Sequence, residues 1–539
     1  MPNYRDTAKD NGSQVTSRIP VITTEHINDF TTTGLVQTID NEAGNITNGV
    51  VDRYAGETDR FYVTDRPLTT TYTVPADGTA VSAKGRGVHV WSSNNKTYIV
   101  NDVTVYENTY ATAITGNLSA SSARRVYFAE WSSAAADYLF IIDPSQGRGY
   151  YINSVEVPLT LHEMTGTGST VTALDAYDFT NFPSDATTGV AMSDGAVVLD
   201  NYLFVANQDG KIYNNSTVDN FLQWPVANIV TAERQNDILS AIVLSKDHLV
   251  ALGSQSIELF YDAANVSPAS PLSARTDIFY TNGLSSGTTG TYIGEGFWQA
   301  GDDIYFISNT SSGDFSLSAL KNFELVSVST STVNSFLRGV STFSQGDYTL
   351  GGFSSGGHTY VLATMYDNPI VTGGVPILTL VYDAGVSAWY VWNTPVASIT
   401  TSYPVKDNTS VVKSNITAGM QLILTNGDVI YIDDRLDGLQ VGFTVILDNI
   451  EFDTTNRKFM HSLAYVGSLV DPAVAATMEI SWSDDNGTNW NTPIEIDLAV
   501  GEQLNRLGSF GRRKFKVANT SVQKLRMEAL EVTYTKGNS

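Results

Sequence analysis

The sequence predicts an all-β protein built around an irregular β-propeller of about five to seven blades. Three observations lead to this class: a high content of strand-forming residues, triplets of strands separated by short turns, and middle strands that are apolar on both faces. The 539 residues include 27 Tyr and 22 Phe, and Thr, Val and Ser are abundant. These residue types favour strands over helices.

The strand triplets recur along the chain. The first covers residues 88–106, the second 125–152 and the third 196–213. Pairs such as Asn101-Asp102 and Asp209-Gly210 separate the strands, and these residue types form tight turns. Each triplet therefore predicts an antiparallel meander joined by hairpin turns.

Later units begin near Ile238, Gly294, Tyr348 and Met420. Their spacing of roughly 40 to 70 residues is typical of propeller blades with inserted loops. The middle strand at residues 138–142 is apolar at every position, as expected where a blade packs against a neighbour on each face. An array of β-sandwiches is the alternative architecture, and residues 228–240 have enough helix propensity for one or two turns.

Composition divides the chain into three parts. Residues 1–57 are polar and weakly periodic, and we expect an extended N-terminal arm or a small element. Residues 58–440 carry the propeller-like pattern. A composition shift near residue 440 and a new set of alternating strands predict an additional C-terminal β domain over 441–539.

The chain is strongly acidic, with a formal net charge of −25. Proteins that hold nucleic acid statically normally show a basic footprint, so this charge argues against static nucleic-acid binding. It also argues against an anionic membrane as partner. It agrees with plain solubility, or with a surface along which DNA moves without adhering. The sequence has no run of about 18 apolar residues that predicts a membrane-spanning helix.

No catalytic, cofactor or metal site is expected. The chain has no Cys, and its six His are scattered without the spacing of a helical metal site. No nucleophile elbow, phosphate loop or dinucleotide fingerprint occurs. Paired carboxylates at Asp302-Asp303, Asp433-Asp434 and Asp484-Asp485 lie in turn contexts, where adjacent side chains do not converge on a cleft.

One turn resembles the Asp-box found on hairpins of sialidases and other propellers. Ser483, Asp485, Gly487 and Trp490 match that motif, whereas Asn489 replaces the usual Thr. The resemblance implies a structural turn, with the Asp tied to backbone amides and the Trp packed inward. Nothing in the sequence specifies the arginine cluster or the Tyr–Glu pair of a sialidase.

A basic stripe follows this turn. By strand alternation Arg512, Lys514 and Lys516 share one face, and Arg513, Phe515 and Val517 the other. Against an acidic background, the stripe is expected to pair with a neighbouring subunit. Contact with DNA and an ordinary solvated strand face are the alternatives.

Three segments together resemble the tail nozzle and DNA-stabilisation proteins of podoviruses, the short-tailed bacteriophages. They are residues 85–106, residues 223–284 with the run from Lys246 to Tyr261, and residues 482–515 with Trp-Ser-Asp-Asp followed by Arg506-Leu507-Gly508. The N-terminal opening does not match the family's form.

This resemblance implies a structural virion protein without catalytic residues or cofactors. The expected role is a tail nozzle or hub subunit that forms part of the DNA ejection channel and helps to retain the packaged genome. The expected partners are other copies in a hexameric ring, the head-to-tail adaptor, a tail needle, tailspike or fibre, and double-stranded DNA in transit. The expected location is the short tail of the virion, assembled in the host cytoplasm.

Two other functions stay open. A glycan-degrading propeller enzyme needs a cleft with two carboxylates and an aromatic platform. A receptor-binding tail adhesin is the other, although the heptads or short solenoid repeats usual in fibres are not found in the sequence.

Overall fold

The computed structural model describes residues 22–27, 46–53, 61–67, 69–72, 84–108, 112–133, 136–169, 176–218, 220–265, 268–285, 295–309, 315–339, 348–366, 376–392, 405–413, 416–424, 426–432, 442–450, 456–469, 474–521 and 523–537. The chain forms two compact units. The propeller unit comprises Thr31–Arg53 and Val63–Val445, and the terminal unit comprises Met1–Phe30, Tyr54–Tyr62 and Ile446–Ser539.

Seven antiparallel blades make up the propeller unit. Blade 1 contains β6 (Gly85–Trp91), β7 (Lys96–Asn101), β8 (Thr104–Glu107) and β9 (Thr112–Asn117), and blade 2 contains β10 (Tyr127–Ser132), β11 (Asp137–Asp143), β12 (Arg148–Asn153) and β13 (Leu161–Glu163). Blade 3 contains β16 (Val197–Leu199), β17 (Tyr202–Ala206), β18 (Lys211–Asn214) and β19 (Ile229–Thr231). Blade 4 contains β20 (Leu239–Ser245), β21 (His248–Gly253), β22 (Ile257–Asp262) and β23 (Leu272–Tyr280).

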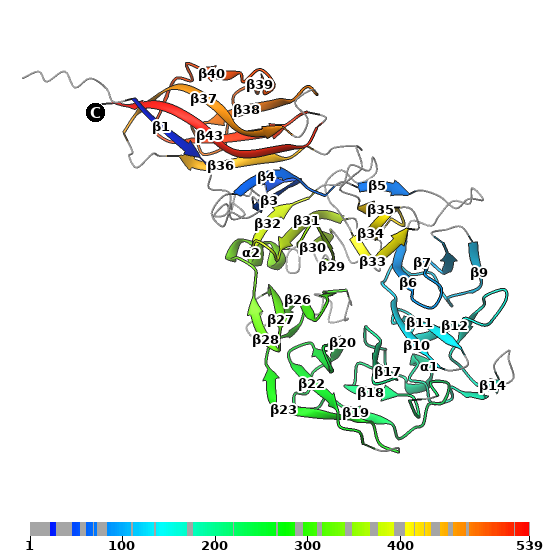
Figure 1. Cartoon of the computed structure of the whole chain (residues 1–539). Helices are drawn as coiled ribbons and strands as arrows, with labels where there is room; N and C mark the ends of the chain where they lie inside the picture. The colour runs from blue at the N-terminus through cyan, green and yellow to red at the C-terminus, as the bar shows by residue number, and fades with distance from the viewer. Residues whose placement is uncertain are drawn as a thin grey trace, which may run out of the picture. The chain divides into compact units, whose positions relative to one another are not determined.

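Blade 5 contains β24 (Gly283–Leu284), β25 (Phe297–Ala300), β26 (Asp303–Asn309), β27 (Phe315–Lys321) and β28 (Glu324–Ser327). Blade 6 contains β29 (Tyr348–Ser355), β30 (His358–Tyr366), β31 (Pro376–Asp383) and β32 (Ala388–Val391). Blade 7 contains β33 (Val405–Lys413), β34 (Ile416–Leu424), β35 (Val429–Ile432) and β5 (Thr69–Tyr72). Figure 1 shows the blades following one another in chain order, from blue through cyan and green to yellow.

This architecture confirms the predicted all-β propeller. The predicted triplets correspond to the first three strands of blades 1 to 3, and the fourth strand of each was missed. The seventh blade begins at Val405, earlier than the predicted start near Met420. The expected helical turns at 228–240 are wrong: Ile229–Thr231 forms β19, because these β-branched residues pair with β18 at the blade edge.

The ring is closed by a strand from the other end of the chain. β5 pairs antiparallel with β35, with Ile430 opposite Thr71, and becomes the outer strand of blade 7. A second early strand, β2 (Ile46–Thr47), pairs with β32 of blade 6 and with the start of β36 (Thr444–Ile450). Closure of this kind covers the two apolar blade faces that a linear array of blades would leave exposed at its ends, and the sheet edges that remain are short.

The blades pack face to face, and β11 shows how. Tyr138, Phe140 and Ile142 belong to a buried cluster with side chains of blade 3. Leu139 and Ile141, which point to the opposite face, belong to a cluster with side chains of blade 1. Alternation places successive side chains on opposite faces, so a strand buried on both sides must be apolar throughout.

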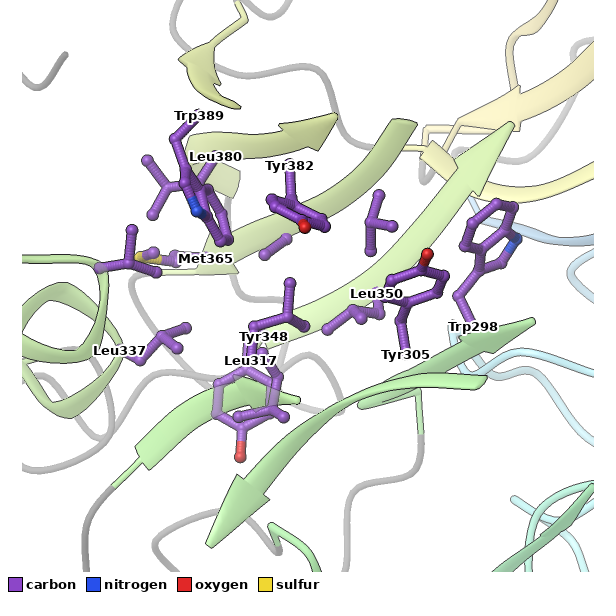
Figure 2. Packing of buried hydrophobic residues seen from close by; sticks show 14 of the residues in the cluster. Trp298, Tyr305, Leu317, Leu337, Tyr348, Leu350, Met365, Leu380, Tyr382 and Trp389 are labelled. Atoms are coloured by element: carbon purple, nitrogen blue, oxygen red, sulfur yellow. The ribbon is translucent and has the colours of Figure 1, made fainter. Parts of the chain in front are cut away.

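A larger cluster lies between blades 5 and 6. Figure 2 shows aromatic and aliphatic side chains from both blades meeting there, with Leu337 of helix α2 (Ser331–Gly339) at one side. Among its fully buried members are Ile307, Leu317, Val333, Leu337, Leu350, Val361 and Leu380. Between blades 2 and 3 the chain adds the pair β14 (Thr167–Ser169) and β15 (Ala176–Asp178) and the short helix α1 (Asp185–Thr188).

The terminal unit is also built of antiparallel strands. β43 (Leu525–Lys536) pairs with β1 (Ile22–Ile27) and with β37 (Lys458–Leu469), and β37 pairs further with β40 (Gln503–Asn505) and β41 (Ser509–Phe510). A second set joins β42 (Arg513–Asn519) to β38 (Thr477–Ser483) and β38 to β39 (Ile494–Asp497). Figure 1 shows β37 and β43 running side by side in orange and red.

The segment expected to be an N-terminal arm or small element contributes strands to both units. Within its described residues, β1 pairs in the terminal unit, whereas β2 and β3 (Gly49–Arg53) belong to the propeller unit. The chain then crosses to the terminal unit after Arg53 and returns within β4 (Phe61–Asp65). The final crossing lies within β36.

The cluster between blades 5 and 6 makes a direct prediction. Leu317→Ala removes a side chain that is fully buried in β27 and leaves a cavity. We expect it to lower the free energy of unfolding by about 2–5 kcal/mol in urea titrations. Val326→Ala in β28 of the same blade is the control, because Val326 is 40% exposed, and its cost should stay near about 0.5 kcal/mol. Equal effects would show that this cluster does not stabilise the blade pair.

Candidate functional site: the sealed axis of the propeller

The first strands of the blades surround the axis of the propeller. β6, β10, β16 and β20 contact one another in sequence, β20 contacts β26, and β25, β29 and β33 continue the ring back to β6. Two glycines allow neighbouring strands to approach closely. A Cβ on Gly85 would lie 2.1 Å from the carbonyl oxygen of Leu424 in blade 7, and one on Gly195 would lie 2.1 Å from that of Ile242 in blade 4.

Arg125 ties blade 2 to the opposite side of the ring. Its Nη1 donates to the carbonyl oxygen of Phe297 at 3.2 Å, and its Nη2 donates to that of Leu350 at 2.5 Å. Its backbone N–H donates to Glu295 Oε1 at 2.6 Å. Arg125 is 5% exposed and Glu295 is 1% exposed. One side chain of blade 2 therefore hydrogen-bonds to blades 5 and 6 near the axis.

The preceding residue connects blade 2 to blade 3. Arg124 Nη2 lies 3.0 Å from Asp194 Oδ1, and the Tyr127 hydroxyl donates to Asp194 Oδ2 at 2.9 Å. Burial, reinforced by the charge of Asp194, raises the pKa of Tyr127 well above its ordinary value. The hydroxyl therefore stays protonated and keeps donating at physiological pH.

A third arginine extends this network to blade 1. Arg86 Nε donates to the carbonyl oxygen of Arg124 at 2.7 Å, and Arg86 Nη2 lies 2.6 Å from Asp143 Oδ1. Both side chains of the Arg86–Asp143 pair are fully buried. Buried ion pairs of this kind persist only where further hydrogen bonds satisfy the charged groups. The axial network, defined as Arg86, Arg124, Arg125, Asp143, Asp194 and Glu295, thus links five of the seven blades.

A cavity of about 400 Å³ adjoins the network. First strands of blades 1 to 5 and Asn408 of blade 7 contribute to its lining. Tyr127 and Phe297 stack across it with ring centroids 5.7 Å apart. A cavity of this size holds on the order of a dozen water molecules. It is far too small for a DNA duplex, whose major groove alone is about 12 Å wide.

A hydrogen-bonded group of His89, Glu130 and Ser92 lies beside this cavity. In a catalytic triad the imidazole bonds to the serine hydroxyl, and here it does not. His89 Nε2 lies 2.6 Å from Glu130 Oε1, and Ser92 donates its backbone N–H and its hydroxyl to the same carboxylate. Burial opposes ionisation of Glu130, but the hydrogen bonds from His89 and Ser92 outweigh burial and lower its pKa. The serine bonds to the carboxylate instead of a basic imidazole, so no group is placed to activate it as a nucleophile.

The predicted Asp-box residues come together in one turn of the terminal unit. The Ser483 hydroxyl donates to Asp485 Oδ1 at 2.7 Å and accepts from the backbone N–H of Gly487 at 2.9 Å. The backbone N–H of Asn489 donates to Asp485 Oδ1 at 2.9 Å. The Asn489 side-chain amide donates to the other carboxylate oxygen at 2.6 Å, so the residue that departs from the motif still caps the Asp.

The predicted basic stripe lies beside this turn. Lys514 pairs in register with Ser483, and the Lys516 ammonium lies 5.7 Å from the centroid of the Trp490 ring. Arg512 is exposed, whereas Lys514 is only 4% exposed. Burial of Lys514 leaves Arg512 as the member of the stripe most accessible to a partner.

The charged residues with the most buried contacts were not among the predicted site residues. Arg513, placed on the apolar face of the stripe, is 2% exposed and holds Asp484 through Nε at 2.6 Å and Nη2 at 2.8 Å. The axial network was also missed. The one local signal was the pair Arg124-Arg125 directly before a strand, but its partners lie on blades distant in sequence.

Three further features concern metal binding, the paired carboxylates and membrane-spanning helices. Within these residues, no group of three or more His, Asp or Glu side chains is arranged to hold a metal ion. Of the paired carboxylates, Asp302 and Asp303 lie at the β25–β26 turn, where Asp303 is 3.7 Å from Lys321 Nζ. Asp433-Asp434 lies outside the described residues. No helix in the described part of the chain is long and apolar enough to cross a membrane.

The axial network predicts a large effect of one substitution. Arg125→Met leaves the carbonyl groups of Phe297 and Leu350 buried without the guanidinium but keeps the backbone N–H that donates to Glu295. Because two buried acceptors lose their donor, we expect a loss of about 2–5 kcal/mol in the free energy of unfolding. Urea unfolding followed by tryptophan fluorescence measures it. The control is Arg148→Met, which removes an ion pair with Glu163 in which both side chains are about one-third exposed; its cost should be below about 1 kcal/mol. A loss of similar size in both variants would contradict the role of Arg125.

The Asp-box turn predicts an unusual titration. The hydrogen bonds from Ser483 and Asn489 lower the pKa of the Asp485 carboxyl to about 2. Carboxyl NMR of the wild type, assigned with Asp485→Asn, should find this midpoint. Ser483→Ala should move it toward the ordinary value of about 3.9. The same midpoint in wild type and Ser483→Ala would show that the turn does not stabilise the carboxylate.

Comparison with known proteins adds a family match. A family model described as "Bacteriophage P22 Gp10, beta-propeller" matches residues 61–419, about two thirds of the chain. No curated protein sequence matches the chain.

Solved structures match the chain at low similarity. The N-terminal domain of Nup159 is 8% identical, covering 71% of this chain and 97% of its own, with a TM-score of 0.36. BamB from Moraxella catarrhalis is 12% identical, covering 72% and 98%, with a TM-score of 0.34. The WD40 domain from Toxoplasma gondii coronin is 10% identical, covering 69% and 88%, with a TM-score of 0.33.

Proposed function

The chain belongs to the family of the bacteriophage P22 Gp10 β-propeller, and from this premise we propose that it is a structural subunit of the nozzle or hub of a short phage tail. In this role several copies form part of the wall of the DNA ejection channel and help to retain the packaged genome. The protein acts in the virion and is assembled into it in the host cytoplasm.

The observation that carries the proposal is the arginine bridge across the axis of the propeller. Arg125 connects blade 2 to blades 5 and 6, and the adjoining cavity measures only about 400 Å³. A duct for DNA therefore cannot run through one propeller and must be enclosed by several copies. A ring with head-to-tail interfaces provides such a duct, and we propose a hexamer.

The distribution of charge along the sequence supports a channel wall that does not bind DNA. The sequence of the propeller unit, residues 31–53 and 63–445, contains 17 Lys and Arg against 38 Asp and Glu, whereas that of the terminal unit contains 14 against 18. Most of the excess negative charge therefore belongs to the part of the sequence that forms the propeller. An acidic wall repels the phosphate backbone and lets a duplex slide without adhesion.

The same charge distribution suggests how copies recognise one another. Arg512 is exposed on a nearly neutral C-terminal segment, and the propeller that a neighbouring copy would present is acidic. We propose that Arg512, together with the half-buried Lys516, faces the neighbouring subunit and not the DNA, whereas Lys514 of the predicted stripe is buried. The head-to-tail adaptor is the proposed partner at one end of the ring, and a tail needle, tailspike or fibre are the proposed partners at the other.

The proposal assigns no catalytic activity to the protein. A glycan-degrading enzyme would need two carboxylates in its cleft, and among the described residues that line the axial cavity Glu130 is the one carboxylate. That carboxylate is already engaged by His89 and Ser92. A receptor-binding adhesin is the remaining alternative. Its position in the particle would distinguish it from a nozzle subunit, because an adhesin lies at the fibre tips and a nozzle subunit on the tail axis.

Oligomeric state tests the proposal. We expect the purified protein to assemble, alone or with its adaptor, into hexameric rings in native mass spectrometry and electron microscopy, and to occupy the tail axis in particles. A protein that stays monomeric with its adaptor, or that lies only at the fibre tips, would contradict it. Release of sugars from host glycans would favour the enzyme.

Charge reversal tests the interface. Arg512→Glu should weaken ring formation at least about tenfold at low salt, because like charges would face each other. Lys211→Glu makes the same charge change at an exposed lysine of blade 3 and should leave assembly unchanged. An Arg512→Glu protein that assembles normally but no longer binds DNA would assign the stripe to DNA instead.

A further inference from the structure

Strand β3 (Gly49–Arg53) is the last part of the propeller unit before the chain crosses to the terminal unit. β3 pairs with β4 (Phe61–Asp65), and three side chains of blade 6 contact it as well. Two of them are neutral: Trp392 Nε1 donates to the carbonyl oxygen of Gly49 at 3.3 Å, and the Tyr390 hydroxyl accepts from the backbone N–H of Val51 at 3.0 Å. Both aromatic side chains are fully buried.

The third contact is ionic and lies closest to the crossing. His358, at the start of β30, places Nε2 3.3 Å from Asp52 Oδ1 and Nδ1 2.7 Å from Asp383 Oδ2. Both ring nitrogens face carboxylate oxygens, so both must donate, and the ring must be a doubly protonated imidazolium. The side chain of Asp383 is fully buried, that of His358 is 11% exposed and that of Asp52 is 37% exposed.

The surroundings fix this imidazolium in place. The backbone N–H of Gly385 donates to Asp383 Oδ1 at 2.9 Å, and the His358 ring stacks on Tyr360 with centroids 5.6 Å apart. The ring nitrogens therefore point to the two carboxylates, one on β31 and the other on β3. A charge buried between two partners forms stronger hydrogen bonds than the two neutral contacts beside it.

We propose that Asp52, His358 and Asp383 form a charge latch that fastens the end of β3 to blade 6. The latch determines the residue at which the connection to the terminal unit begins. When it is closed, the connection starts after Arg53. When it opens, Asp52 and Arg53 lose this fastening to blade 6 and fray more readily from their pairing with β4, while the contacts at Gly49 and Val51 remain. The latch is a conformational device of the propeller and does not depend on the role proposed for the virion.

The ionisation of the latch is defined by the groups that face it. Hydrogen bonds from His358 to Asp383 and Asp52 raise its pKa to about 10 despite its burial. Tyr390 on β32 also lies close to Asp383, and burial, reinforced by that carboxylate, raises its pKa well above its usual value. Because the pKa of His358 is raised, its stabilisation is complete below the unfolded value of about 6.5 and is lost as pH rises through about 10. The latch is therefore closed at neutral pH.

Hydrogen exchange of the full-length protein tests the latch. In His358→Gln, the backbone amides of residues 52 and 53 should exchange roughly tenfold faster than in wild type at pH 7.5, because a charge-assisted pair is lost. The amide of Val51, which donates to the Tyr390 hydroxyl, should not change. The ratio between the two proteins should fall toward one as pH rises through about 10. His162→Gln is the matched control: His162 Nε2 lies 2.8 Å from the Glu156 carboxylate in blade 2, and its loss should leave these amides unchanged.

A second variant keeps the test decisive if His358→Gln does not fold. Asp52→Asn alters the more exposed partner and removes only the charge, so the propeller should fold with the same amides exchanging faster. Unchanged exchange in Asp52→Asn, or faster exchange that spreads equally through blade 6, would overturn the latch. A pH-independent ratio between wild type and His358→Gln would overturn its ionic character.

Discussion

Face-to-face packing of the blades is the interaction on which the rest of the structure depends. In β11, Phe140 packs toward blade 3 and Ile141 toward blade 1, and both are fully buried. Each blade therefore needs a neighbour on both sides to cover its apolar faces, since every fully buried aliphatic or aromatic side chain contributes about 1.5–3 kcal/mol. A linear row of blades would leave its first and last faces exposed, and closing the row into a ring covers them.

Closure creates two further constraints that the molecule meets with non-local contacts. The last blade lacks an outer strand of its own, and β5 supplies it from far upstream in the sequence. At the axis, the first strands approach closely, and Gly85 and Gly195 avoid backbone clashes that any side chain would cause. The axial network then satisfies buried carbonyl groups that would otherwise lack donors, with Arg125 bridging the ring.

These constraints bear on function. A propeller whose axis is crossed by buried, hydrogen-bonded arginine side chains is a rigid block more than a container for a substrate. Rigidity suits a subunit that must resist pressure in a particle, and a block of this kind offers its outer surfaces to partners. The charge latch between β3 and blade 6 adds a defined end to the rigid part, beyond which the chain continues into the terminal unit.

The sequence by itself determined the strands, the turns and the fold class, because alternation, β-branched and aromatic residues and turn pairs act over a few residues. It also identified the Asp-box turn, whose hydrogen bonds run among residues 483–489. The fourth strands of blades 1 to 3 were not predicted. Edge strands such as β19 are short and only half-buried, so their sequences show little alternation of apolar and polar residues.

Only the tertiary structure decided the closure by β5, the buried state of Lys514 and the partners of Arg125 and His358. Each depends on residues far apart in the chain, such as Arg125 and Leu350 or Asp52 and His358, that meet only when the ring is complete. No local pattern predicts these contacts. The sequence around a charged residue before a strand is the same whether that residue faces solvent or a carboxylate on another blade.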